Sequence, residues 1–407
     1  MSRINVLIAD KFAAWGMDEL VEAGCDVTCD PVLAGDALRE KIAATGCRLL
    51  VVRSTKVTAD MLEASAELAV VVRAGAGYNT IDVAAASRRS ILVANCPGKN
   101  AVAVAELTLG LILALDRRLA DNTIDLRNGV WNKSEYAQAR GLKRRTLGIV
   151  GLGEIGKAVA RRALAFEMNV LGWSRSLTEE GATRLGIGRC ATIAQLASAS
   201  DVLTVHLAAN DDTRGIISAD VIDNLKPGSY LINTSRADVL DYKALAVAIR
   251  ERQIRAGLDV FPHEPGSGAS AFSDPIMKVD GVVYGTHHIG ASTEQAQEAI
   301  ARETIRIIQA YKTTGHVPHC VNLQGESPAR YVLVVRHRNR PGVLAHTLDA
   351  ISHGGTNVEE MENIICAGAQ AACARILLDG PLSQDVLTQI RTGNEHVFAV
   401  TISPLKD

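Results

Sequence analysis

The sequence predicts an α/β protein with two doubly wound parallel-sheet domains and a smaller C-terminal βαββαβ domain. Up to residue 287, short apolar runs alternate with helical patterns, which is typical of parallel sheets covered by helices. A glycine-rich turn separates a strand from a helix near the middle of the chain. A linker rich in Gly, Pro and polar residues, 316–328, precedes a change of pattern. At 407 residues the chain is long enough for two or three domains.

The first domain is predicted to comprise residues 1–98 together with 288–318. Its strands are expected at the apolar runs 4–9, 49–52, 69–73 and 90–94. A long helix that begins near Ala101 carries the chain into the second domain. A helix over 293–313 is long enough to bring the chain back to the first domain, which is why 288–318 is assigned there.

The second domain, residues 99–287, contains the glycine-rich turn Gly151-Leu152-Gly153-Glu154-Ile155-Gly156. In a β-turn-α-β unit, Gly151 permits the tight turn, Gly153 lets the backbone approach phosphates, and Gly156 lets the helix pack closely. The helix N-terminus, with Glu154 and Ile155, is therefore predicted to bind the pyrophosphate of a dinucleotide in a Rossmann-like domain. Strands are predicted at 146–150, 169–173, 201–206, 229–233, 255–259 and 281–285.

The end of the second strand of this unit bears on which dinucleotide is bound. An NAD enzyme usually has Asp or Glu there to bond the ribose 2′-hydroxyl, whereas this chain has Ser174-Arg175-Ser176. No carboxylate is present there to repel a 2′-phosphate, and Arg175 is suited to pair with one. The cofactor is therefore NAD(P), with the residues favouring NADP(H) and leaving NAD(H) open.

Polar residues follow three consecutive strands of the second domain. Arg236 comes after 229–233, Glu264 and Asp259 come after or at the end of 255–259, and His288 comes after 281–285. Ligands bind outside the carboxyl ends of parallel strands. An Arg there holds a carboxylate with two parallel hydrogen bonds, and a His oriented by a carboxylate takes a hydroxyl proton while a hydride leaves the same carbon.

The third domain is predicted over 329–407, with strands at 330–336, 357–364, 370–378 and 396–402 and helices at 342–353 and 382–391. That βαββαβ order is ferredoxin-like. The segment has no evident nucleophile or acid–base pair, so a binding role is expected. The turn before its first helix, Arg340-Pro341-Gly342, leads into N–H groups that can hold a carboxylate.

Composition excludes several classes of function. The formal net charge is −2, so the chain lacks the basic footprint of a nucleic-acid or anionic-membrane binder. No run approaches the roughly 18 apolar residues of a membrane span, and eight scattered cysteines without a CxxC pair indicate a reducing compartment, which predicts a cytoplasmic protein. The group His316, His319 and Cys320 is interpreted as linker, so no metal site is expected.

At these residues the chain resembles the D-isomer-specific 2-hydroxyacid dehydrogenases. The resemblance covers about residues 1 to 320 and rests on the glycine turn and on three further motifs: Asn233-Thr234-Ser235-Arg236, Asp259-Val260-Phe261 with Glu264-Pro265, and His288-Ile289-Gly290-Ala291-Ser292-Thr293. It implies that Arg236 binds the substrate carboxylate, that His288 is the acid–base and that Glu264 orients it. Asp259 is expected to bind the cofactor, and the first domain is expected to bind substrate. The family usually has Pro before its catalytic His, where this chain has His287.

Within the family, the chain most resembles the phosphoglycerate dehydrogenases that carry a C-terminal ACT domain. The resemblance implies that substrate anions meet Arg53 and Ser54, Arg73, and the loop with Gly75, Gly77 and Asn79. It also implies that L-serine is an effector bound by the tail residues His337, Asn339 and Asn357. The first two come just after the predicted strand 330–336, and Asn357 begins the predicted strand 357–364. ACT-like modules pair through their sheets, so a homodimer or homotetramer is expected.

The sequence therefore predicts hydride transfer between C2 of a 2-hydroxy acid and NAD(P), with 3-phosphoglycerate as the leading substrate, at the entry to serine biosynthesis. A glyoxylate or hydroxypyruvate reductase is the alternative within the same class, and Ser174–Ser176 would suit it. An alternative of another class is a nucleotide-sensing interaction protein similar to the C-terminal-binding corepressors. The ACT-like tail argues against that alternative.

Overall fold

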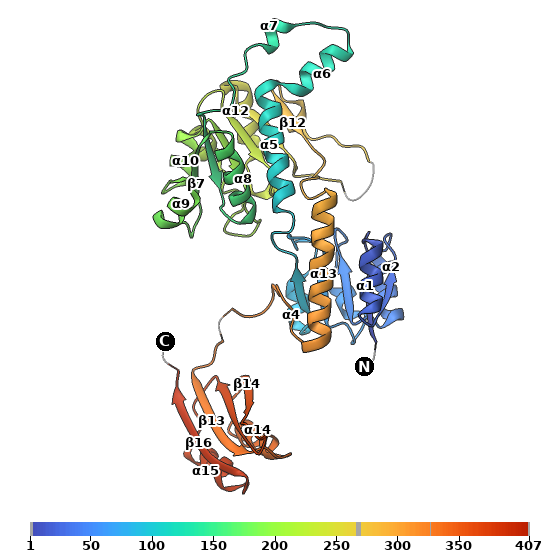
Figure 1. Cartoon of the computed structure of the whole chain (residues 1–407), viewed down its shortest axis with the longest axis vertical. Helices are drawn as coiled ribbons and strands as arrows, with labels where there is room; N and C mark the ends of the chain where they lie inside the picture. The colour runs from blue at the N-terminus through green and yellow to red at the C-terminus, as the bar shows by residue number, and fades with distance from the viewer. Residues whose placement is uncertain (1–2, 266–269, 326, 406–407) are drawn as a thin grey trace. The chain divides into compact units, whose positions relative to one another are not determined.

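The computed structural model describes residues 3–265, 270–325 and 327–405. Its internal contacts divide the chain into two compact units, Met1–Asn322 and Leu323–Asp407. The first unit contains two parallel sheets, and the second contains one antiparallel sheet (Figure 1). Both parallel sheets and the C-terminal βαββαβ sheet were predicted from the sequence, and the fold class is confirmed.

The five-stranded sheet has the order β2-β1-β3-β4-β5 and is parallel throughout. The sequence missed its edge strand β2, because the segment Cys25–Cys29 has a single fully buried side chain and so little apolar signal. Its strands are β1 (Ile4–Ile8), β2 (Cys25–Cys29), β3 (Leu49–Val52), β4 (Val70–Arg73) and β5 (Leu92–Asn95). The connecting helices are α1 (Ala14–Glu22), α2 (Gly35–Thr45), α3 (Ala59–Glu63) and α4 (Val83–Arg88).

Helix α13 (Glu294–Thr314) packs against this first sheet, although it follows the second sheet in the chain. Its side chains Ile300, Ile305, Ile307 and Ile308 are buried in the same apolar cluster as strand residues of β1, β3 and β4. Burying four isoleucines fixes the helix to the sheet, since each fully buried side chain of this size contributes about 1.5–3 kcal/mol.

The seven-stranded sheet has the order β12-β11-β10-β9-β6-β7-β8, again parallel. Strand β6 pairs with both β7 and β9, so the chain runs outward on one side of β6 and then on the other. This reversal creates a crevice at the carboxyl end of β6, where a doubly wound sheet binds its ligand. Its strands are β6 (Thr146–Val150), β7 (Asn169–Trp173), β8 (Gly188–Arg189), β9 (Val202–Val205), β10 (Tyr230–Asn233), β11 (Arg255–Leu258) and β12 (Val283–Gly285).

Helices cover both faces of this sheet and bury two apolar clusters against it. They are α5 (Ala101–Arg117), α8 (Glu154–Ala165), α9 (Glu179–Leu185), α10 (Ile193–Ala199), α11 (Ala219–Asp223) and α12 (Tyr242–Arg252), with 3-10 turns at Ala237–Val239 and Pro275–Lys278. Helix α8 begins at Glu154, inside the glycine motif itself. Within the described ranges, no helix combines the length and apolarity that crossing a bilayer requires.

Two further helices, α6 (Leu119–Arg127) and α7 (Lys133–Tyr136), were not predicted. They project from the end of α5 and bury no side chain (Figure 1). Several apolar side chains in and between them are exposed, and Trp131 reaches 80% exposure. We refer to residues 119–136 as the arm.

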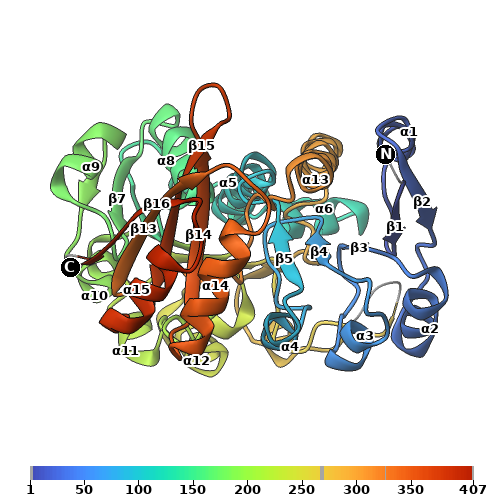
Figure 2. The ribbon, with the colours of Figure 1, turned by 90° about the horizontal axis from the view of Figure 1, so that it is seen from below.

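The second unit contains one four-stranded antiparallel sheet of order β14-β15-β13-β16. Helices α14 and α15 lie side by side on one face of it and bury a compact apolar cluster (Figure 2). Its elements are β13 (Tyr331–Arg338), α14 (Val343–His353), β14 (Val358–Ile365), β15 (Ala371–Leu378), α15 (Gln384–Thr392) and β16 (Val397–Pro404). The ferredoxin-like order is thus as predicted.

Candidate active site

The glycine turn after β6 has the geometry that its spacing indicates. Gly151 has φ 94°, and a Cβ there would lie 2.4 Å from the carbonyl oxygen of His206. A Cβ on Gly156 would lie 2.0 Å from the carbonyl oxygen of Gly151, so neither position tolerates a side chain. A Cβ on Gly153 would meet no atom within 4 Å, which leaves open space beside the N-terminus of the 12-residue helix α8. This space is where a pyrophosphate would approach the N–H groups.

A hollow of about 400 Å³ lies beyond the end of β7. Ser174 and Ser176 line it, and so do two cations that the sequence did not single out, Lys157 and Arg184. Arg175 is placed differently: its Nη1 is 2.9 Å from Asp212 Oδ2, and the two side chains are 68% and 73% exposed. The structure therefore gathers the serines at the hollow and pairs Arg175 with an acid 37 residues away.

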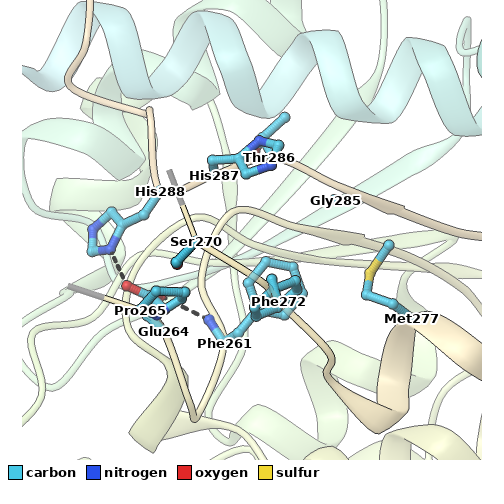
Figure 3. Close-up of a pocket in the computed structure, with 10 residues that line it drawn as sticks. All are labelled: Phe261, Glu264, Pro265, Ser270, Phe272, Met277, Gly285, Thr286, His287 and His288. Atoms are coloured by element: carbon cyan, nitrogen blue, oxygen red, sulfur yellow. Dashed lines mark hydrogen bonds and ion pairs between the residues drawn. The ribbon is translucent and has the colours of Figure 1, made fainter. Parts of the chain in front are cut away.

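Glu264 and His288, predicted to act together, are in direct contact (Figure 3). His288 Nδ1 lies 2.6 Å from Glu264 Oε2, and Glu264 Oε1 accepts a hydrogen bond from the Phe261 amide at 2.8 Å. Both residues line a pocket of about 560 Å³ whose other walls include Phe272, Met277 and Thr286. A carboxylate at Nδ1 favours the tautomer with its proton there, which leaves Nε2 to exchange a proton with a substrate.

Glu264 is held in its ionised form. Burial acts to raise the pKa of its carboxyl, but the hydrogen bonds from His288 and from the Phe261 amide outweigh burial, and the charge of Arg236 adds to them. The net result is a pKa below the ordinary value of 4.5. An ionised Glu264 stabilises the imidazolium that forms when His288 accepts a proton.

The loop that carries His288 is fixed by Asp259. This carboxylate is 1% exposed and accepts hydrogen bonds from Thr286 Oγ1 (2.6 Å), the Ile289 amide (2.9 Å) and the Gly290 amide (2.9 Å). His288 itself has φ 52°, a left-handed conformation that such bracing supports. Asp259 was predicted to bind the cofactor, and its observed contacts are with this loop. His287 lines the same pocket but points away from Glu264 (Figure 3).

Two arginines, Arg53 and Arg236, lie close enough for their charges to act on a third, Arg73. Burial, together with the nearby charges of Arg236 and Arg53, lowers the pKa of Arg73 to about 10. Burial also lowers the pKa of Arg236. Within the described part of the chain, none of the three side chains forms an ion pair. Half-buried like charges that form no ion pair indicate a site for an anionic ligand.

The loop of Gly75 and Gly77 encloses two of these guanidiniums. A Cβ on Gly75 (φ 151°) would lie 1.4 Å from Arg73 Nη1, and a Cβ on Gly77 would lie 2.0 Å from Arg236 Nη2. A side chain at either position would displace the guanidinium beside it, and the φ of Gly75 disfavours a side chain there in any case. Asn79, in the same loop, is exposed.

Two residues of this region escaped the sequence analysis. Asp10 follows β1, and its Oδ2 accepts the amides of Arg53 (2.6 Å), Ser54 (3.2 Å) and Thr55 (3.2 Å). Its position directly after the first predicted strand could have marked it as a candidate, because ligands bind at the carboxyl ends of parallel strands. Asn100 lies at the start of α5, and its buried Oδ1 has no hydrogen-bond partner among the described residues. The buried Nε of Arg73 has none there either.

The tail residues predicted to bind an effector lie apart within one chain. His337 is buried, with Nδ1 2.8 Å from the Arg338 carbonyl and Nε2 3.2 Å from Asn363 Oδ1. Asn339 bonds the Ala369 carbonyl beyond one end of β13, whereas Asn357 is at the opposite end, bonded to Glu359. Eight residues of strand, about 26 Å, separate the two ends. A small ligand touching both asparagines would need them from two chains.

In the described residues, no three His, Cys, Asp or Glu side chains are grouped as a metal site would require. Of the linker residues considered for a metal, His319 instead contacts Glu303 and Arg306.

Comparisons with known proteins agree with this geometry. The profile of the family described as "D-isomer specific 2-hydroxyacid dehydrogenase, NAD binding domain" matches residues 109–290. A D-3-phosphoglycerate dehydrogenase of Methanocaldococcus jannaschii is 34% identical over 97% of this chain and 74% of its own length. A D-3-phosphoglycerate dehydrogenase of Mycobacterium leprae is 34% identical over 79% of this chain, which spans only 59% of that longer protein.

Other similar proteins have different names. A hydroxypyruvate reductase of Thermotoga maritima is 38% identical over 64% of this chain and 83% of its own length. A 3-phosphoglycerate dehydrogenase of Entamoeba histolytica, solved with NAD+ bound, has a TM-score of 0.66 at 26% identity and covers 79% of this chain and 99% of its own. With its paired His and Glu, its glycine turn and these relatives, the chain belongs to the D-isomer specific 2-hydroxyacid dehydrogenase family.

Proposed function

We propose that the protein interconverts a phosphorylated 2-hydroxy acid and its 2-oxo acid, with 3-phosphoglycerate as the substrate and the first step of serine biosynthesis as its place. The observation that carries this proposal is the group of three arginines: the charges of Arg53 and Arg236 act on Arg73, and the charge of Arg236 also acts on Glu264, the partner of His288. One guanidinium suffices to clamp a carboxylate through two hydrogen bonds. The other two suit a second anionic group such as a phosphate.

In the proposed reaction, Arg236 holds the substrate carboxylate and so fixes C2 relative to His288. Nε2 of His288 accepts the proton of the C2 hydroxyl, and the C2 hydrogen leaves as hydride with the electron pair of the C–H bond. The electron pair of the former O–H bond then forms the C=O bond. A nicotinamide, when bound, would supply the hydride acceptor. Glu264 stays ionised throughout and stabilises the imidazolium.

A matrix of substrates and cofactors on the purified protein tests the proposal. Turnover of 3-phosphoglycerate well above that of D-glycerate, which lacks the phosphate, is the expected result. Preferential turnover of hydroxypyruvate or glyoxylate would replace the proposal with the reductase alternative, which the Thermotoga maritima relative and the Ser174–Ser176 segment favour. No turnover of any of these acids would support an interaction protein on this fold instead.

For the cofactor we propose NADP(H). The hollow beyond β7 is lined by Ser174, Ser176, Lys157 and Arg184, and its described lining contains no carboxylate. Arg175 is free to change partner at small cost, because an exposed pair such as Arg175–Asp212 is worth about 0–1 kcal/mol.

We expect Arg175→Ala and Lys157→Ala each to raise the KM for NADPH by about tenfold and to leave the KM for NADH nearly unchanged, since each removes a charged hydrogen bond to the 2′-phosphate. Arg161→Ala, an exposed change on the same helix as Lys157, is the control. Steady-state kinetics at one fixed ionic strength provide the measurement. Equal effects on both cofactors, or a wild type that prefers NADH tenfold, would reject the NADP(H) assignment.

We propose that the protein forms a homodimer or homotetramer. The arm exposes several large apolar side chains within a short stretch of chain, which supports a contact surface there: Leu119, Ile124, Leu126, Val130 and Trp131. In the second unit, β14 is an eight-residue edge strand with exposed Met361, Ile364 and Ile365, and a second copy would cover it. The opposite positions of Asn339 and Asn357 along β13 are consistent with an effector site shared by two chains.

L-serine is the proposed effector, and we expect wild type to bind it calorimetrically at millimolar concentration. Asn357→Ala should abolish the heat, while Gln384→Ala, an exposed change on α15, should preserve it. Inhibition requires serine to prefer a less active state, with a coupling of about 5-fold to 150-fold in affinity. Absence of heat with wild type would remove serine as the ligand.

A further inference from the structure

The segment His319–Asn322, at the end of the first unit, covers the β5 edge of the five-stranded sheet. Cys320 forms an antiparallel bridge with Ala94 of β5. The Val321 amide donates to the Val93 carbonyl at 2.7 Å, and the Asn95 amide donates to the His319 carbonyl at 3.3 Å. Four residues thus act as a short sixth strand.

Asn322 extends this strand with its side chain. Its Oδ1 accepts the Val93 amide at 2.8 Å, and its Nδ2 donates to the Ile91 carbonyl at 2.9 Å and to Ser87 Oγ at 3.1 Å. The side-chain amide therefore bonds to the strand as the next peptide group of an added strand would. The side chain of Asn322 thus holds the segment to β5 at Val93, to Ile91 just before that strand, and to Ser87 of α4.

The opposite end of the segment is fixed by a buried carboxylate. Glu303 of α13 is 6% exposed and contacts His319 Nε2 (3.1 Å), Lys99 Nζ (3.0 Å) and the Arg306 guanidinium. The hydrogen bond from Arg306 is the largest of the effects that lower the pKa of Glu303 to about 2. The carboxylate is thus ionised at neutral pH and holds the segment against α13.

The strand that receives this segment also holds the loop of the anion site. Nδ2 of Asn95, the last residue of β5, donates to the Ala76 carbonyl at 2.6 Å, and the Cys96 amide donates to the Gly75 carbonyl at 2.9 Å. Asn95 is 8% exposed and so has little freedom to move. The loop it holds is the one in which Gly75 and Gly77 enclose the guanidiniums of Arg73 and Arg236.

We propose that Asn95 and Asn322 are positioning residues for the substrate-anion site: the segment His319–Asn322 sets β5, Asn95 sets the loop Gly75–Gly77, and the loop sets Arg73 and Arg236. Neither asparagine contacts the substrate in this arrangement. The inference deepens the proposed function, because it concerns the same arginines. Its physical basis is the close approach of the loop at Gly75 and Gly77 to the two guanidiniums, so a shift of the loop changes the space that Arg73 and Arg236 occupy.

Asn322→Ala and Asn95→Ala test the proposal in the full chain. Each should raise the KM for the acid substrate about fivefold to tenfold and should leave kcat within twofold and the KM for the dinucleotide unchanged. Gln324→Ala, an exposed change two residues beyond the segment, is the matched control and should alter none of these. Asn95→Ala keeps the backbone bond to His319, so it remains informative if Asn322→Ala does not fold.

Binding of oxalate, a small dianion, measured by calorimetry gives a readout that does not depend on which acid is turned over. Its Kd should weaken in parallel with KM in both variants. A fall in thermal stability with unchanged KM and unchanged oxalate Kd would show that the asparagines are merely structural and would overturn the proposal. Failure of 3-phosphoglycerate as a substrate, with oxalate binding weakened as expected, would overturn the proposed substrate and leave this inference standing.

Discussion

His288→Ala is expected to lower kcat by about 10²-fold to 10⁴-fold, the range for removing a general acid–base. The ring receives its orientation from Glu264, whose Oε2 lies 2.6 Å from Nδ1, and its loop is braced by three hydrogen bonds to Asp259. Alanine removes the proton acceptor but leaves that bracing, which uses backbone amides and Thr286. The loss should therefore appear in kcat rather than in stability.

His287→Ala is the matched control, because His287 precedes His288 and lines the same pocket. It points away from Glu264 and should change kcat only slightly (Figure 3). The measurement is steady-state kinetics of both variants, with thermal unfolding in parallel. A larger loss at His287 than at His288 would transfer the acid–base role to His287.

Arg236→Lys is expected to lower kcat/KM by about 10²-fold or more. An ammonium is a point charge and cannot form the planar pair of hydrogen bonds that a guanidinium makes with a carboxylate. Each hydrogen bond to a charged group contributes about 1.5–3 kcal/mol, so losing one of the pair and misplacing the other accounts for this factor. The side chain is also enclosed by Gly77, so a lysine of different shape would leave part of that space empty.

Arg88→Lys provides the control for Arg236→Lys, because Arg88 is exposed at the end of α4. Its kcat/KM should match that of wild type. The effect of Arg236→Lys should fall mainly on the acid substrate, and the dissociation constant of the dinucleotide measured by calorimetry should change much less. Near-normal kcat/KM in Arg236→Lys would remove Arg236 as the carboxylate ligand.

Elements with a strong local signal could be predicted from the sequence. The glycine turn, the buried strands of the second sheet and the βαββαβ order of the tail were all found, because turns and apolar periodicity depend on residues close together in the chain. The edge strands β2 and β8 and the arm were missed. Strand β2 carries little buried surface, and the arm exposes its apolar side chains, so neither shows the pattern of a buried face.

The sequence by itself determined which residue types stand at the ends of the parallel strands, and hence the candidates Arg236, Glu264 and His288. Only the tertiary structure decided their partners. Arg175 pairs with Asp212, and Asp10 accepts a hydrogen bond from the Arg53 amide. Gly77, in a loop of the first sheet, lies beside the guanidinium of Arg236 from the second sheet. These contacts join residues 37 to 159 positions apart, as counted from the sequence. Local propensity carries no information about such pairs, because the packing of whole elements brings them together.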